Sequence, residues 1–217
     1  MTEDKDFKKV VRERSAKTGE SHSAARRMLA GESGNQDLTV VRNQLAYAFT
    51  LLWQEFRPAL RGLTDDEYLW QPVADCPTIH SQPDGTYRCD AQFPVGGAAS
   101  VAQRLCWIAQ ITRVRTNQHF GDKSVVAGDV ASVPGTAKAG VEWLGEAVAA
   151  WAAGLAAADP TLLTRHSENL SPGSMDGQFL FVDVVWHHLQ LLAQCTSQVS
   201  LLRDIYLAQR PDVVSAR

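Results

Sequence analysis

The 217-residue sequence has little of several features that would point directly to a function. No apolar run approaches the roughly 18 residues that a membrane-spanning helix requires, so an integral membrane protein is not expected. The first residues, MTEDK, are charged and precede no apolar segment, which argues against a secretory signal. We therefore expect a cytoplasmic protein.

Cysteine and glycine patterns are equally uninformative. The four cysteines form no CxxC pair, which gives no support to a zinc ribbon or a thioredoxin-type motif. Cys76 and Cys89 flank a turn-rich stretch and could approach each other, so a disulfide between them is one alternative. Reduced thiols are the default for a cytoplasmic chain. Neither GxxxxGK[ST] nor GxGxxG occurs, so no phosphate-binding loop is predicted.

Charge and composition are those of an ordinary globular protein. The net charge is -3, with 45% hydrophobic and 21% charged residues, enough apolar surface for one domain with a short extension. Residues 1–30 carry eight basic against five acidic residues. This basic arm either docks on an acidic partner or packs on the rest of the chain through Phe7, Val10 and Met28. Its acidic residues dilute the positive field, so nucleic-acid binding is not expected, and neither is a membrane partner.

Helical periodicity dominates the rest of the chain. Residues 1–35 are interpreted as a basic arm of two short helices, 6–15 and 23–30, followed by a polar linker at 32–36. Residues 36–217 are predicted to form an all-α, four-helix bundle. Its first helix is expected to start at Asp37 as N-cap and to kink or end at Pro58. The other three are expected at about 98–119, from Thr136 to Asp159, and at about 178–208.

A long irregular segment, residues 64–97, connects the first two helices of this predicted bundle. It is rich in proline and glycine, and short strands are predicted near residues 87–88, after the turn Pro83-Asp84-Gly85. A connection of this length within a compact domain is usually functional. Two readings stay open: a cover for one end of the bundle, or a cover that also contacts a ligand.

Four phrases resemble the DinB-like superfamily, in particular an actinobacterial branch. They are LTDDEYLW at residues 63–70, PDG at 83–85, HFGD at 119–122 and LLRDIY at 201–206. The resemblance covers roughly residues 38–207. It implies a four-helix bundle, often a homodimer, and a divalent metal held by three histidines. Relatives include mycothiol-dependent isomerases and transferases.

The residues of this chain depart from the histidine pattern that the resemblance implies. The second-helix ligand position falls on Trp107, within the phrase RLCWI, and the last-helix positions fall on Leu191 and Cys195. His187 lies one turn before Leu191 on the same helical face, whereas His188 is expected to point about 100° away. A rearranged zinc or nickel site that includes His187 and a loop histidine such as His119 is an open alternative, but no metal or other cofactor is expected.

Two functions follow from this departure. The first is a degenerate bundle that binds a small molecule or a protein partner, and the second is an enzyme with a rearranged or metal-free site, in the range of thiol-dependent transferases, isomerases or hydrolases. No catalytic residue is assigned. An apolar pocket is the feature that both functions share. Its candidate lining residues are Trp70, Trp107, His119, His187, Leu191 and Cys195.

Overall fold

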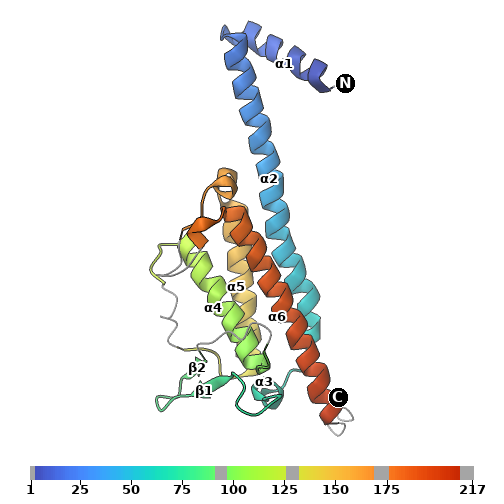
Figure 1. Cartoon of the computed structure of the whole chain (residues 1–217), viewed down its shortest axis with the longest axis vertical. Helices are drawn as coiled ribbons and strands as arrows, with labels where there is room; N and C mark the ends of the chain where they lie inside the picture. Colours follow the sequence, from blue (N-terminus) through green and yellow to red (C-terminus); the bar gives the residue numbers. More distant parts are fainter. Residues whose placement is uncertain (1–2, 91–96, 126–131, 169–175, 211–217) are drawn as a thin grey trace.

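The structure is a computed structural model that describes residues 3–90, 97–125, 132–168 and 176–210. It is built almost entirely of helices (Figure 1). The α-helices are α1 (Glu3–Thr18), α2 (His22–Phe56), α3 (Asp65–Leu69), α4 (Val101–Phe120), α5 (Ala137–Ala157) and α6 (Phe181–Gln209). Short 3-10 helices occur at η1 (Arg57–Leu60), η2 (Pro160–Thr164) and η3 (Asp176–Gln178). The strands β1 (Ile79–Ser81) and β2 (Tyr87–Cys89) form one antiparallel pair.

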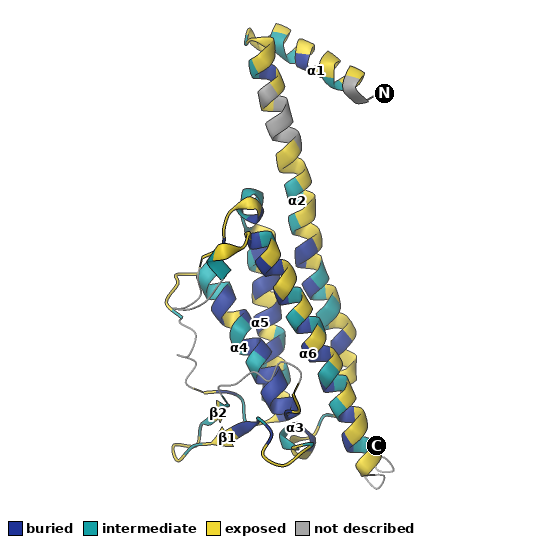
Figure 2. Ribbon diagram, in the orientation of Figure 1, coloured by how far each residue is buried: buried dark blue, intermediate teal, exposed yellow. Residues whose placement is uncertain are grey.

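The four long helices α2, α4, α5 and α6 lie side by side (Figure 1). Helix α5 packs against α2 and α4, and α6 packs against α4 and α2. Their buried residues line the sides on which the helices face one another (Figure 2). Trp151, Phe49, Phe181 and Tyr68 are among the largest fully buried side chains. The prediction of an all-α fold is therefore confirmed.

Polar residues begin several of the helices as the sequence rules require. A serine or threonine precedes each of four helices, and its hydroxyl oxygen accepts a hydrogen bond from the backbone N–H three residues later. These N-caps are Ser21, Thr64, Ser100 and Thr136. Helix α2 ends at Phe56, two residues before Pro58, so the predicted stop at this proline is confirmed.

The predicted linker at residues 32–36 is wrong, because α2 runs without a break from His22 to Phe56. Asp37 is an interior helical residue and not an N-cap. Serine, glycine and asparagine disfavour a helix by at most about 1 kcal/mol each, and propagation from helix already formed on both sides overcomes that cost. The first turns of α2 project beyond the bundle and carry α1, which packs on them through Val11 and Ala25 (Figures 1 and 2).

The connection between α2 and α4 covers the end of the bundle where α6 finishes (Figure 1). It contains α3, which the sequence did not predict, and the strand pair, which confirms the strands expected near residues 87–88. The buried Glu67 of α3 accepts a 2.6 Å hydrogen bond from Arg203 Nε on α6. Tyr68 donates to the carbonyl of Pro134 over 3.0 Å. These bonds tie the cover to α6 and to the start of α5.

Candidate functional site

A buried polar cluster occupies the opposite end of the bundle, where α4 finishes and α6 begins. Thr112, Arg115 and His119 lie on α4 at spacings of three and four residues, so their side chains share one helical face. His188 reaches this face from α6, and Asp176 reaches it from η3, just before α6. We call these five residues the Arg115 cluster. Three elements therefore converge on one point in the bundle.

The hydrogen bonds of the cluster determine the tautomer of His188, which is fully buried. A guanidinium can only donate, so Arg115 Nη1 donates to His188 Nδ1 over 3.0 Å. The Nε2 of His188 must then carry the proton, and it donates to Thr112 Oγ1 over 3.1 Å. The hydroxyl of Thr112 in turn donates to the carbonyl of Ile108 over 2.6 Å. His188 is thus a neutral imidazole with both nitrogens engaged.

Electrostatics favour the same protonation state for both histidines of the cluster. Burial lowers the pKa of His188 well below its ordinary value, and the neighbouring positive charge of Arg115 lowers it further. Burial and Arg115 together lower the pKa of His119 to about 4. At neutral pH the cluster therefore holds one buried cation, Arg115, beside two neutral imidazoles.

Arg115 is only 3% exposed, and its charge is incompletely matched. Its described ion-pair partner is Asp176, whose Oδ1 lies 3.6 Å from Nη2, a separation too long for a hydrogen bond. Within the described part of the chain, three buried nitrogens of this region have no hydrogen-bond partner: Arg115 Nε, His119 Nε2 and Trp151 Nε1. Buried polar atoms in folded proteins are almost always satisfied, so these three require an explanation.

Aromatic rings of the core pack against the two histidines of the cluster. The ring of Trp151 lies 5.0 Å from that of His188 and 6.2 Å from that of His119, measured between centroids. Phe181 lies 4.6 Å from His119, and Phe49 stacks on His188 at 5.5 Å. An apolar wall of this kind strengthens every electrostatic interaction of the guanidinium.

The structure reverses the expected positions of the two adjacent histidines. His187, which the sequence analysis placed on the inner face of the last helix, is exposed, and His188 is buried. The reason is the register of α6. Its buried stripe begins at Phe181 and continues through His188 and Cys195 to Val199, a spacing of seven, seven and four residues. His187 lies about 100° from this stripe.

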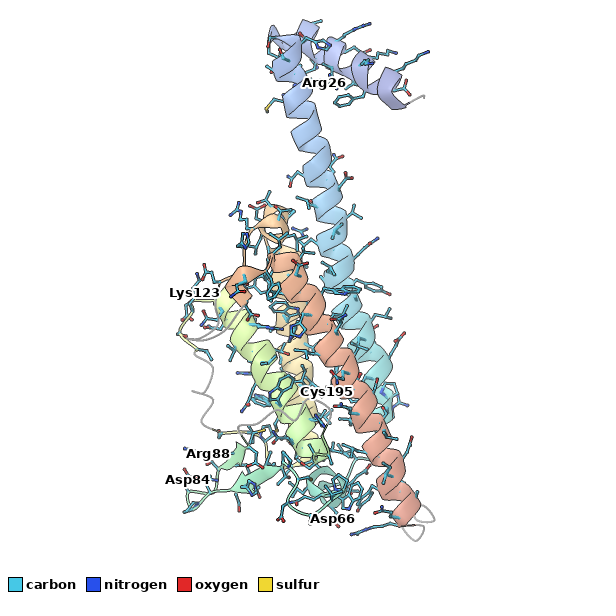
Figure 3. All side chains as sticks on the ribbon, in the orientation of Figure 1. Arg26, Asp66, Asp84, Arg88, Lys123 and Cys195 are labelled. Carbon is cyan, nitrogen blue, oxygen red and sulfur yellow. The ribbon has the colours of Figure 1, made fainter. Side chains whose placement is uncertain are left out.

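The other candidate pocket residues lie outside the Arg115 cluster. Trp107 of α4 and Leu191 of α6 are both partly buried and pack against the core. Cys195 lies midway along α6 (Figure 3), where its thiol donates to the carbonyl of Arg104 over 3.1 Å. Trp70 packs on Tyr206 at the far end of the bundle. Only His119 belongs to the Arg115 cluster.

Arg115, the residue at the centre of the cluster, was not among the site residues predicted from the sequence. A usable signal was present: Thr112, Arg115 and His119 continue the apolar stripe of α4 through Ile108 at helical spacing, which places polar side chains on a buried face.

Lys123, just beyond the end of α4 (Figure 3), is exposed and pairs with Glu168 at 2.6 Å. It does not belong to the buried cluster.

The four cysteines are all free thiols, and the disulfide left open between Cys76 and Cys89 is absent. Burial raises the pKa of Cys195 and of Cys106 to about 12. Both thiols are therefore protonated at neutral pH, which removes the nucleophilic form. Cys195 is a buried core residue with a satisfied hydrogen bond.

The architecture defines an all-α bundle with a closed polar cluster at one end. The family profile of the DinB superfamily matches residues 48–195, well over half of the chain. The chain belongs to the DinB superfamily. No curated protein and no solved structure gives a significant match. In the described part of the chain, no helix is long and apolar enough to cross a membrane.

The residues present do not fit the three-histidine metal site that the family resemblance implies. Trp107 and Leu191 offer no ligand atom, and the thiol of Cys195 is protonated and bonded to a carbonyl. In the ranges that the structure describes, no group of three His, Cys, Asp or Glu side chains is arranged to hold a metal ion. At the Arg115 cluster, a guanidinium occupies the lone pair that His188 would offer to a metal.

Proposed function

We propose that this chain is a DinB-superfamily protein that binds a small molecule at the Arg115 cluster without a metal ion. The observation that carries this proposal is the bond from Arg115 Nη1 to His188 Nδ1. A ligating imidazole needs a free lone pair on nitrogen, and a divalent cation would also be repelled by the adjacent guanidinium. The three unpartnered nitrogens beside it support a polar ligand as the missing partner.

Binding is tested directly through the indole N–H of Trp151, which gives a separate resonance in a ¹H–¹⁵N correlation spectrum. The uniformly labelled full chain is screened, in EDTA, against small carboxylates, phosphates, amines and neutral amides. Movement of the Trp151 signal, assigned with W151F, by one class of compound is the expected result. If no compound of any class moves that signal, the proposed function is wrong.

Metal independence needs its own measurement. The metal content of the untagged protein is determined by mass spectrometry, before and after incubation with zinc, nickel and manganese. We expect less than stoichiometric metal in every sample. A stoichiometric metal would contradict the proposal, and it would point instead to a rearranged site that includes His187 or His119.

An enzymatic function is the second candidate, and the state of the His119 side chain favours it. Its Nε2 has no hydrogen-bond partner among the described residues, and its low pKa leaves a neutral imidazole at pH 7. A neutral imidazole with an unpartnered nitrogen can accept a proton, and its low pKa makes it a weak base that would act only on a substrate held directly beside it. Hydrolysis of p-nitrophenyl acetate, and thiol transfer to 1-chloro-2,4-dinitrobenzene, are compared between the native chain and H119Q. Equal rates for both proteins in both assays would dismiss this candidate.

A homodimer is proposed as the assembly state. Val40, Tyr47 and Leu51 are exposed on α2 and lie on one side of the helix by their spacing of seven and four residues. A stripe of this kind is a common basis of helix association. Light scattering at micromolar concentration is the test, and a monomer would contradict the proposal. L51E is expected to shift a dimer toward monomer.

A further inference from the structure

We propose that the ligand of the Arg115 cluster is a carboxylate, and that it takes the place of Asp176 at the guanidinium. This inference rests on the proposed function and adds the chemical class of the ligand. Arg115 is 3% exposed, and a buried guanidinium is stable only beside an anion or a set of acceptors. One acceptor is described as bonded to it, the neutral Nδ1 of His188.

The ion pair with Asp176 shows which chemical group can lie beside Arg115. Its carboxylate Oδ1 lies 3.6 Å from Nη2, close enough for attraction and too far for a hydrogen bond. Asp176 is partly exposed and belongs to the short helix η3, whereas Arg115 lies on the long helix α4 and is held by its hydrogen bond to His188 of α6. An incoming carboxylate that bonds to the guanidinium therefore gains a contact that Asp176 does not make.

The unpartnered nitrogens are the further groups that we expect to bond to the carboxylate. Arg115 Nε and Trp151 Nε1 are N–H donors without a partner in the described ranges, and both belong to side chains that are at least nine-tenths buried. A carboxylate has acceptor capacity for several donors, whereas an ammonium ion offers none. His119 Nε2 completes the set as a third donor, either in the neutral Nε2–H tautomer or after uptake of a proton. Proton uptake by His119 would balance the added negative charge.

Alternative ligand classes fit less well. A cation would meet the buried guanidinium of Arg115 at close range. A neutral amide would satisfy donors but leave the positive charge unchanged. A phosphate brings up to two negative charges against one guanidinium and the carboxylate of Asp176, in surroundings formed by the rings of Trp151 and Phe181. A monoanion matches the single cation best.

The experiment uses matched pairs of probes that differ only in charge. Acetate is compared with acetamide, and benzoate with benzamide, by the shift of the Trp151 indole signal at constant ionic strength. We expect at least one carboxylate to bind about tenfold more tightly than its amide, the ratio for one charge-assisted hydrogen bond. Inorganic phosphate is titrated in parallel.

Three variants test whether carboxylate binding depends on Arg115 and competes with Asp176. R115M is expected to weaken carboxylate binding about tenfold or more, whereas R113M, which removes an exposed arginine on the same helix, is expected to leave it unchanged. D176N removes the internal competitor, so carboxylates should bind more tightly than to the native chain. Because D176N changes a partly exposed residue, it keeps the test decisive even where R115M does not fold.

The outcomes separate this inference from the proposed function. Carboxylate binding that D176N strengthens supports both. Binding of an amine, an amide or phosphate with no response to carboxylates overturns the carboxylate assignment and leaves small-molecule binding intact. Carboxylate binding that D176N does not strengthen overturns the exchange with Asp176. No response to any class overturns both proposals.

Discussion

Arg115 Nη1 donates to His188 Nδ1 over 3.0 Å, between two helices whose contacting residues are 73 positions apart in the sequence. This bond fixes a neutral Nε2–H tautomer on His188, because the second described bond of the ring, to Thr112 Oγ1, needs a donor: the Thr112 hydroxyl gives its own proton to the carbonyl of Ile108. It places a permanent cation beside a histidine. The chemistry available at this end of the bundle follows from that one contact.

The tautomer of His188 is the first prediction. Long-range ¹H–¹⁵N spectra of the native chain at pH 7 should show a protonated Nε2 and an unprotonated Nδ1. In R115M the Nδ1 lone pair loses its donor, and the pKa of His188 should rise because a nearby positive charge is removed. A doubly protonated His188 in the native chain at pH 7 would contradict the hydrogen-bond assignment.

Stability should depend on pH through His119 and His188. Both have a folded-state pKa below the unfolded value of about 6.5, so the unfolded chain binds more protons below that pH. The stabilisation is complete above pH 6.5 and is lost as the pH falls toward 4. Urea unfolding between pH 7.5 and 5.5, where few carboxylates titrate, measures this slope. H119Q should reduce it, and an unchanged slope would show that His119 is not buried as a neutral group.

The ion pair of Glu67 with Arg203 should be necessary for stability. Glu67 is fully buried and Arg203 is 6% exposed, with additional bonds from Arg203 to the carbonyls of Ala59 and Arg61. E67Q leaves the guanidinium buried without its counter-charge, which should lower the free energy of unfolding by about 3 to 5 kcal/mol. The control is E142Q, which removes an exposed pair with Lys138 at 4.0 Å. Its effect should be close to zero.

The thiols should be unreactive in the folded protein. Burial raises the pKa of Cys89, Cys106 and Cys195 to about 12, so almost no thiolate exists at pH 8. Ellman's reagent should react with Cys106 and Cys195 only after urea is added. Cys89, which is half-buried, serves as the internal comparison and should react first. Rapid modification of Cys195 in the native chain would reopen a nucleophilic role for it.

Two glycines of the N-terminal arm, Gly34 within α2 and Gly19 in the turn before it, test the structure of this region. Gly34 lies inside the helix with open space around its missing Cβ, so G34A should stabilise this part of α2 by about 0.5 to 1 kcal/mol. Gly19 has a φ of +73° between α1 and α2, so G19A should destabilise the turn. Amide hydrogen exchange of residues 22–40 measures both effects. Faster exchange in G34A would contradict a continuous helix.

Local patterns determined the secondary structure of most of the bundle. The spacing of apolar residues located α4, α5 and α6 to within a few residues, and Pro58 marked the end of α2. The same local rules failed at residues 32–36, because weak helix formers were read without the helices that flank them. The family phrases anticipated the DinB superfamily, and the matched region, residues 48–195, lies within the range that those phrases covered.

Tertiary structure decided which polar residues meet. Periodicity alone did not distinguish His187 from His188, since the register of α6 depends on what it packs against, and that register brought His188 to Arg115. The sequence by itself determined the positions of α4, α5 and α6 and the end of α2, since these follow from residue spacing and from a proline along one chain. In the Arg115 cluster, Arg115 of α4 is 61 positions from Asp176 of η3 and 73 positions from His188 of α6, and only the packed bundle brings them within ion-pairing or hydrogen-bonding distance.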